Sequence, residues 1–147
     1  MSSYMELAAA ETYFESRMFT DDWTDASDAN KTKALAHATR LIDQLNYKGD
    51  KTKSTQTNQF PRDSDTTVPT VITYACAEIA LKLLEGIDPE QEAEAALLAS
   101  LQMTDVKQST ITGEVAIWHI SGIPSVTAWR HLLPYLRDTS LVRLERA

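Results

Sequence analysis

The residues with the clearest capacity for chemistry lie in one polar stretch of the chain, between positions 46 and 67. This stretch carries Lys48, Lys51, Lys53 and Arg62, and Phe60 stands two residues before the arginine. Basic side chains attract phosphates or an acidic protein surface, and an aromatic ring can stack on a nucleobase or anchor a contact. The stretch is also longer than the roughly two to eight residues that usually connect packed helices. We therefore expect it to be either disordered or a functional loop, facing DNA or a partner protein.

Catalysis, cofactors and metals find little support in the rest of the sequence. The three histidines, His37, His119 and His131, fall on different predicted elements, so none has the partner that a zinc pair or a catalytic triad requires. Gly49 lacks the further glycine and Lys-Ser/Thr of a phosphate-binding loop. The single cysteine, Cys76, lies on the apolar face of a predicted helix, where a small buried thiol is expected. The sequence predicts a protein that is not an enzyme and that uses no cofactor or metal.

Charge is distributed unevenly along the chain of 147 residues, whose net charge is −7. Residues 1–30 hold seven acidic residues and one basic residue, and residues 31–62 hold seven basic and two acidic ones. Residues 63–105 are again acidic, with nine acids and one base, and residues 106–147 hold five bases and three acids. The negative total argues against a general nucleic-acid binder, because affinity for phosphates comes mostly from clustered Lys and Arg. Blocks of opposite sign favour contacts between copies of the chain, basic block to acidic block.

Helices must position the polar stretch, and apolar residues three and four positions apart predict where they lie. The pattern indicates a mainly α protein, a small bundle of about four to five helices. We expect helices over about 5–18, 29–45 and 68–85, another that begins after Asp88, and a last one over 124–136. The helix over 68–85 has the broadest apolar face and is the expected centre of the core.

Residues typical of helix ends support these boundaries. Pro69 lies in the first turn of the central helix and Gly86 just past its end. Asp88 is placed to cap the next helix, and Pro134 is expected to shorten the last one. The cap of the helix over 29–45 stays open among Thr24, Asp25 and Ser27. The polar face of that helix, which we expect to be solvated or to face a partner, carries Lys31, Lys33, Arg40 and Gln44.

The period changes in the C-terminal third, where β-branched and alternating residues predict an extended arm or hairpin. The pattern covers about residues 106–120, and the tail over 140–146 also alternates. The arm carries Val115, Ile117, Trp118 and Ile120. A lone two-stranded ribbon is marginal in water and an open strand edge invites another chain, so we expect this arm to contact a neighbouring subunit.

Several short motifs give the sequence a resemblance to a known family. They are Tyr4 with Leu7 to Phe14, Trp23, Ala34 with Ala38 to Asp43, Gln59 to Arg62, Val68-Pro69 with Ala77-Glu78 and Leu81, and Pro134 to Leu136. In this order they resemble a family of small tailed-phage proteins that are similar to head-completion or head–tail connector adaptors and are often labelled DnaT-like single-stranded-DNA-binding. The family usually has a tryptophan where this chain has Phe60.

The resemblance implies a structural virion protein rather than an enzyme. Residues 1–147 would form one adaptor domain, with a helical core over about 5–103 and the arm, last helix and tail over about 104–147. Copies would form a ring, usually of twelve, beneath the portal protein in the neck of the virion. DNA would pass through the ring without sequence-specific binding, and the next neck or tail protein would dock on it. The loop residues Lys48, Lys51, Lys53, Phe60 and Arg62 would then face the portal, a neighbour or the channel.

Two further expectations complete the sequence-based account. The alternative function is single-stranded-DNA binding, in which Tyr47 and Phe60 would stack on bases among the lysines. No stretch approaches the roughly 20 apolar residues that cross a bilayer, and the N-terminus lacks a basic segment followed by an apolar run. We therefore expect a soluble protein, assembled in the host cytoplasm, with no membrane partner.

Overall fold

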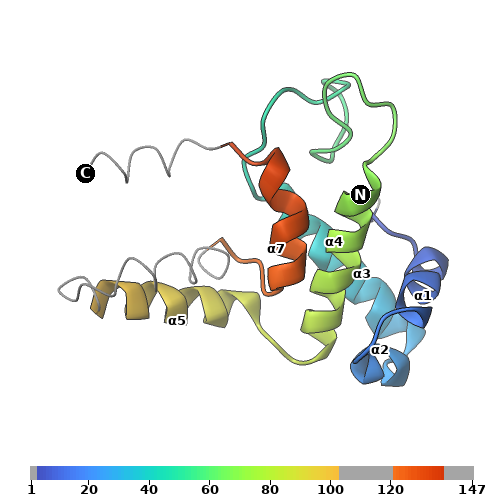
Figure 1. Ribbon diagram of the computed structural model, residues 1–147, viewed down its shortest axis with the longest axis vertical. Coiled ribbons are helices and arrows are strands. Elements are labelled where there is room, and N and C mark those ends of the chain that lie inside the picture. Colours follow the sequence, from blue (N-terminus) through green and yellow to red (C-terminus); the bar gives the residue numbers. More distant parts are fainter. Residues whose placement is uncertain (1–2, 103–120, 138–147) are drawn as a thin grey trace.

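The fold is mainly helical in the computed structural model, which describes residues 3–102 and 121–137 (Figure 1). The elements are α1 (Leu7–Glu15), α2 (Asp21–Asp25), α3 (Asp28–Asp43), α4 (Thr70–Leu84), α5 (Pro89–Gln102), α7 (Val126–Leu132) and the 3₁₀ turn η1 (Leu133–Tyr135). The mainly α prediction is confirmed, with six α-helices in these ranges against the four to five expected. Between them the described residues form only two isolated β-bridges. The predicted arm with Val115, Ile117, Trp118 and Ile120, and the alternating tail, lie outside the described residues.

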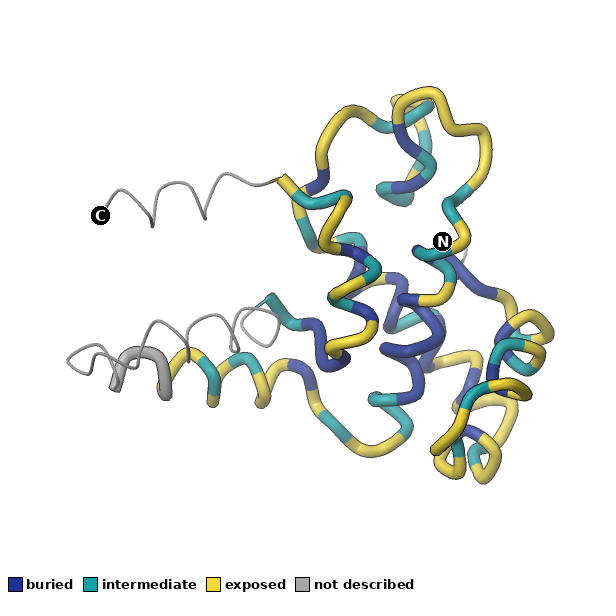
Figure 2. Tube along the Cα trace, viewed as in Figure 1, coloured by how far each residue is buried: buried dark blue, intermediate teal, exposed yellow. Residues whose placement is uncertain are grey.

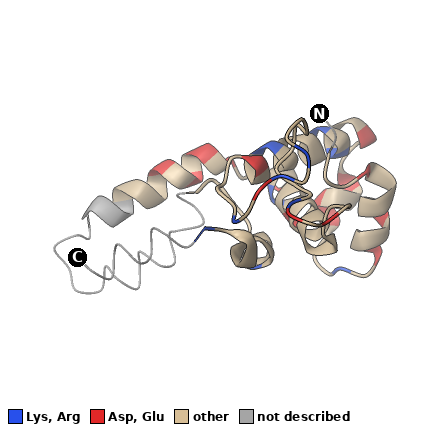
Figure 3. Ribbon diagram, turned by 90° about the horizontal axis from the view of Figure 1, so that it is seen from above, with Lys and Arg blue, Asp and Glu red and all other residues tan. Residues whose placement is uncertain are grey.

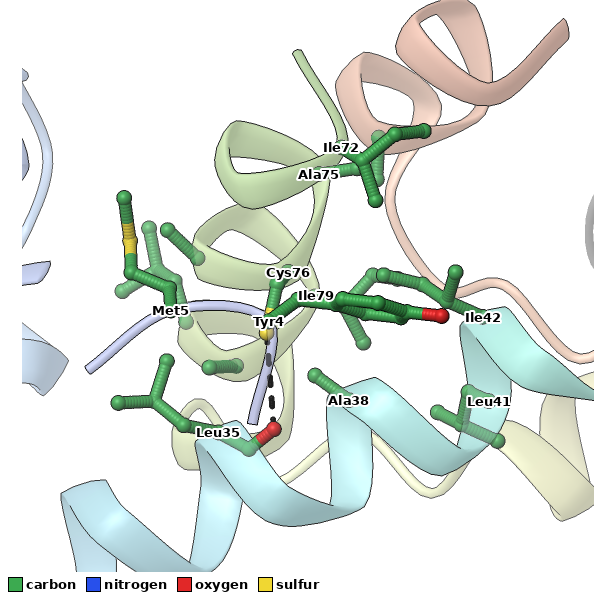
Figure 4. Close-up of a cluster of buried hydrophobic side chains, with 14 of the residues drawn as sticks. Tyr4, Met5, Leu35, Ala38, Leu41, Ile42, Ile72, Ala75, Cys76 and Ile79 are labelled. Carbon is green, nitrogen blue, oxygen red and sulfur yellow. Dashed lines mark hydrogen bonds between the residues drawn. The ribbon is translucent and has the colours of Figure 1, made fainter. Parts of the chain in front are cut away.

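Helix α4 is the centre of the core, as its apolar pattern predicts. It packs against α3 and α7, with further contacts to α1 and α2. Every residue from Ala75 to Leu81 is buried, so α4 is enclosed on most sides and not on one broad face only (Figures 2 and 4). Alanines at 75, 77 and 80 make this possible, because small side chains let neighbouring helices approach closely. Cys76 is fully buried, with its Sγ 3.5 Å from the carbonyl oxygen of Leu35.

Local sequence signals account for most helix boundaries. Ser27 is the cap of α3, where its Oγ accepts a hydrogen bond of 3.2 Å from the amide of Asn30. Gly86 follows α4 with a φ of +92°, the left-handed conformation that glycine adopts without strain. Asp88 accepts a bond of 2.9 Å from the amide of Glu90 at the start of α5. Pro134 lies in η1, so the last α-helix ends earlier than residue 136, for the predicted reason.

Two features near the N-terminus differ from what the sequence indicates, and in both cases tertiary contacts explain the difference. The connector around Trp23 contains a short helix, α2, which lets the indole pack into the core with only 1% of its surface exposed. Lys31, expected on a solvated face, is buried: its Nζ lies 2.8 Å from Glu11 Oε1 and 5.3 Å from the centre of the Trp23 ring. The same Glu11 accepts a bond of 3.2 Å from Trp23 Nε1, so one carboxylate satisfies both buried groups.

The first helix is also shorter than the predicted range of 5–18. Tyr4 and Met5 precede α1 and are nonetheless buried. The amide of Tyr4 donates to the Oγ1 of Thr39 on α3 at 3.0 Å, so the chain enters the fold tied to α3. Tyr4 and Met5 are therefore buried because the chain is hydrogen-bonded to α3 at this point, and not because they lie on the apolar face of a helix.

Helix α5 projects away from the rest of the bundle (Figures 1 and 3). Most of its described side chains are exposed, and these include Leu97 and Leu98, with exposed fractions of 49% and 58%. Acidic side chains line its first half, as Figure 3 shows. No helix among the described residues is long and apolar enough to span a membrane.

Candidate interaction site in the long loop

The long loop, residues 46–69, is folded around the guanidinium group of Arg62. Nε of Arg62 donates to the carbonyl oxygen of Lys48 at 2.8 Å, and Nη2 donates to that of Gly49 at 2.6 Å. Nη1 donates to both the carbonyl oxygen and the Oε1 of Gln59, at 3.1 and 2.9 Å. A planar group with five donors can hold several carbonyl oxygens at once, which a lysine cannot do. Arg62 thus joins the first and last parts of the loop.

Backbone contacts complete this closure. Lys51 and Arg62 form an antiparallel bridge, with the amide of Thr52 donating to Pro61 at 3.1 Å and that of Asp63 donating to Asp50 at 2.7 Å. Gly49 has a φ of +71°, and a Cβ added there would lie 2.2 Å from Asp63 Oδ1. The sequence left open whether this stretch is disordered or a functional loop, and the structure shows an ordered loop.

Phe60 attaches the loop to the body of the protein. Its ring is 3% exposed and meets the rings of Tyr4, Tyr47 and Tyr135 edge-on, with centroids 6.0, 4.7 and 5.5 Å away. These three tyrosines come from the N-terminal segment, the start of the loop and η1. The predicted anchoring role of Phe60 is therefore directed inward, to the chain's own core. The Phe60–Pro61 peptide bond is cis.

A half-buried carboxylate, Asp43 at the end of α3, supports this aromatic cluster. Its Oδ1 accepts hydrogen bonds from the hydroxyl of Tyr4 and from the amide of Gln59, the latter at 3.1 Å. The Tyr4 oxygen in turn accepts the amide of Phe60 at 3.1 Å. Burial raises the pKa of Asp43 above its ordinary value, although the Tyr4 and Gln59 bonds and the charge of Lys51 act in the opposite direction.

The loop lysines are the members of the predicted site that reach the surface. Lys48 and Lys53 are exposed, and Lys51 is half-buried with its Nζ 3.4 Å from the carbonyl oxygen of Gln56. Phe60 and Arg62 are buried, and a partner could reach them only where they line the pocket described below. A prediction of direct contact with DNA or a portal protein therefore rests on the lysines, because the other two side chains are used to fold the loop.

The pocket lies between the loop and η1 and has a volume of about 220 Å³. We call it the loop pocket; it is lined by Lys48, Phe60, Arg62, Asp63, Asp65, Pro134 and Tyr135. The rings of Phe60 and Tyr135 and the apolar surface of Pro134 give it an apolar side, and charged groups of both signs stand around it. Sequence reasoning missed Pro134 and Tyr135 as part of the site, since only folding brings η1 against the loop. The bridge between Tyr47 and Leu136 and the bond from the Lys48 amide to Tyr135, 2.8 Å long, make that contact.

A second polar cluster, around Glu78 of α4, was not predicted as a structural site. Glu78 is 1% exposed and forms two bonds with Arg17, Nε to Oε2 at 3.0 Å and Nη2 to Oε1 at 2.8 Å. The hydroxyl of Tyr13 donates to Oε2 at 2.5 Å. Burial alone would raise the pKa of Glu78, but the bonds from Arg17 and Tyr13 outweigh it and lower the pKa. The sequence signal that could have revealed this cluster is the position of Glu78, a charged residue within the apolar pattern of α4.

The described residues hold no group of three or more His, Cys, Asp and Glu side chains that could bind a metal ion. Burial raises the pKa of the Cys76 thiol to about 11, so it is protonated at neutral pH and a poor nucleophile. His37 and His131 lie on α3 and α7, and His119 lies outside the described residues.

Comparison with known proteins gives one match, to a family defined by sequence. No curated protein and no solved structure shows significant similarity to this chain. The sequence model of a family described as "Putative DnaT-like ssDNA binding protein" matches residues 1–140. This range includes the whole long loop, both polar clusters and all the described helices. The chain therefore belongs to the family described as "Putative DnaT-like ssDNA binding protein".

Proposed function

We propose that this protein is a structural subunit of a tailed-phage virion, assembled as a ring beneath the portal in the head–tail connection. The observation that carries the proposal is helix α5. It has 14 residues and no extensive contact with another described element, and it presents Leu97 and Leu98 to solvent. A helix of this length is only marginally stable in water by itself, and exposed leucines gain free energy when a partner covers them.

The features of the loop agree with a role in assembly. Its large side chains fold it into a rigid surface unit, and its lysines form a basic surface between acidic parts of the chain. Charge segregated in this way favours contacts between protein subunits. In the resemblance described above, such a ring extends the DNA channel, offers a platform to the next neck or tail protein, and takes no part in sequence-specific DNA binding. Its place would be the neck of the virion.

The proposal is tested by mixing the purified protein with the portal protein of the same phage. We expect mass photometry to show an added ring of subunits and negative-stain images to show an extra layer below the portal. If the mixture contains only free portal and free subunit, the proposal is wrong. L97E/L98E should prevent or weaken the addition, whereas Gln91→Glu, exposed on the same helix, should not.

A second set of variants tests the loop lysines. Lys48→Glu, Lys51→Glu and Lys53→Glu, introduced together, reverse the charge of the loop surface. Substitutions of exposed residues such as Lys48 and Lys53 usually change the free energy of unfolding by less than about 0.5 kcal/mol each. Lys51 is half-buried, so K48E/K53E, which leaves it in place, is the matched control for folding. Reduced portal binding is expected. Unchanged portal binding and phage assembly would show that the loop lysines face neither the portal nor the channel.

Single-stranded-DNA binding is the second candidate, and the family description supports it more directly than it supports the connector. The geometry restricts how it would occur. Tyr47 and Phe60, the aromatic residues placed for base stacking, are 2% and 3% exposed, and the Tyr47 hydroxyl donates to the carbonyl oxygen of Ile42 at 2.6 Å. Binding would therefore depend on Lys48 and Lys53 and on phosphates, with a strong dependence on salt.

A fluorescence anisotropy titration with a labelled oligonucleotide separates the two functions. Micromolar binding at about 150 mM salt, with a steep salt slope that the triple lysine variant reduces, would support DNA binding. If wild-type protein and triple variant give the same weak signal, binding through this loop is excluded. Portal binding measured on the same samples shows which of the two functions the lysines serve.

A further inference from the structure

The turn between α1 and α2 presents two large apolar side chains to solvent. Met18 and Phe19 are 72% and 84% exposed, the two highest values among the large hydrophobic residues described. Phe19 has a φ of +62°, a left-handed conformation that is rare and strained for a bulky residue. A strained backbone that displays a phenyl ring to water stabilises neither the turn nor the core, which suggests a role in recognition. We call residues 16–20 the Phe19 turn.

The Phe19 turn is held rigidly from inside the protein. Arg17, which forms the two bonds to buried Glu78, also donates from Nη1 to the carbonyl oxygen of Met18. Its amide donates to Phe14 at the end of α1 at 3.2 Å, and the amide of Thr24 in α2 donates to Thr20 at 3.0 Å. Arg17, held by the buried carboxylate of Glu78, thus fixes the backbone next to Phe19. A preorganised apolar residue loses little conformational entropy when it binds, which favours affinity.

The loop pocket is a suitable acceptor for such a ring. A cavity of about 150 Å³ is enough for a benzene molecule, and the loop pocket has about 220 Å³ with Phe60, Tyr135 and Pro134 in its lining. In Figure 1 the Phe19 turn lies at the lower right, beside α2, and the long loop lies at the top. The Phe19 turn and the long loop are well separated within one molecule (Figure 1), so the phenyl ring of one chain can reach only the loop pocket of another.

Charge is complementary between the two surfaces. Exposed acids flank the Phe19 turn, namely Glu15, Asp21, Asp22 and Asp25. The loop that forms the pocket carries the basic residues Lys48, Lys51 and Lys53, and Lys48 lines the pocket itself. Asp63 and Asp65 also line the pocket, but Asp63 Oδ1 already accepts the amide of Asp50 at 3.1 Å. Lys48 is thus the lining residue that attracts the acidic turn of a neighbour.

We propose that Phe19 of one subunit inserts into the loop pocket of the next subunit, giving a head-to-tail contact between copies of this chain. Two different surfaces meet in this contact, so it is repeatable around a ring and is not a two-fold dimer. The inference deepens the proposed ring assembly and rests on it. It assigns the subunit contact to Met18 and Phe19 on one side and to Lys48, Tyr135 and Pro134 on the other.

Cysteine cross-linking tests the pairing directly in the full-length protein. Two single variants, Met18→Cys, which keeps the Phe19 ring, and Lys48→Cys, are mixed under a mild oxidant, alone and with the portal protein. The native Cys76 is fully buried and does not compete. We expect the mixed disulfide to form faster than the disulfide between two M18C chains, and much faster than a link from M18C to Glu90→Cys on α5. Equal rates for the three pairs would overturn the inference.

Assembly of substitution variants separates this inference from the proposed function. Phe19→Gly removes the phenyl ring and the backbone strain together, so the variant should stay folded. It should weaken subunit association roughly 10- to 100-fold, as expected for the loss of one Phe contact. Phe19→Leu should weaken it less. D21K/D22K should also weaken association, and K48E/K53E added to the partner subunits should restore it. If the wild-type ring forms and F19G leaves it unchanged, the Phe19 contact is wrong while the ring stands; if no ring forms at all, both are wrong.

Discussion

Replacement of Arg62 by methionine is the sharpest test of how the long loop is held. Methionine keeps an unbranched apolar stem but removes four hydrogen bonds, to Lys48, Gly49 and twice to Gln59. Bonds from a charged donor contribute about 1.5–3 kcal/mol each when they are shielded from water. Lys48 and Gly49 are exposed, so water replaces the donor there at small cost. With only the two Gln59 bonds counted in full, we expect R62M to lower the free energy of unfolding by about 3–6 kcal/mol.

Two measurements check this value and its origin. Urea unfolding followed by circular dichroism gives the change in free energy, and amide hydrogen exchange locates it. The amides of Thr52 and Asp63, which close the loop by bonds to Pro61 and Asp50, should exchange faster in R62M, while those of α4 should follow only the global change. Arg62→Lys keeps the charge without the planar fork and should lose about half as much stability. A change below about 1 kcal/mol with unaltered loop exchange would refute the idea that the guanidinium organises the loop.

Three further substitutions probe the same framework. Phe60→Ala should lower the free energy of unfolding in urea by about 3–5 kcal/mol, because the ring is buried against three tyrosines; a loss under 1 kcal/mol would mean that the loop is not anchored there. Gly49→Ala should destabilise more than Gly86→Ala in the same assay: both have positive φ, but only at Gly49 would the new Cβ meet Asp63 at 2.2 Å, so equal effects would contradict the close approach. Glu78→Gln should cost about 2 kcal/mol at pH 7, a value reduced for the 28% exposure of its partner's side chain. In the folded protein the pKa of Glu78 lies below its ordinary value of 4.5, so the stability that the ionised carboxylate adds is present above about pH 4.5 and is lost as the pH falls through the folded pKa. A difference in the free energy of unfolding between wild type and E78Q that persists in acid would contradict this.

The helices were predictable because their signals are local. Ser27, Pro69, Gly86 and Asp88 act on the residues next to them, and the apolar spacing of α4 needs no knowledge of its neighbours. The unusual length of the loop was visible in the same way. The sequence also placed the core at α4, since no other segment has so many apolar residues at helical spacing.

Contacts between distant residues were not predictable in this way. The sequence pattern around Lys31 is that of a surface position, and the residue can be buried only because Glu11 and Trp23 lie next to it in the fold. The inward direction of Phe60 depends on Tyr4 and Tyr135, which come from opposite ends of the described chain. Periodicity carries no information on such contacts, so the sequence indicated an unusually long loop but assigned two of its side chains, Phe60 and Arg62, to contacts with a partner.

The two roles of the loop follow from this difference. Arg62 and Phe60 already have their polar and apolar partners inside the chain, so a partner molecule cannot take them over without unfolding the loop. Lys48 and Lys53 have exposed side chains and contribute little to folding, which leaves them available for recognition. Substitutions at the first pair should therefore change stability and binding together, whereas those at the second pair should change binding alone. This separation allows a loss of assembly in a loop variant to be attributed either to a misfolded loop or to a lost contact.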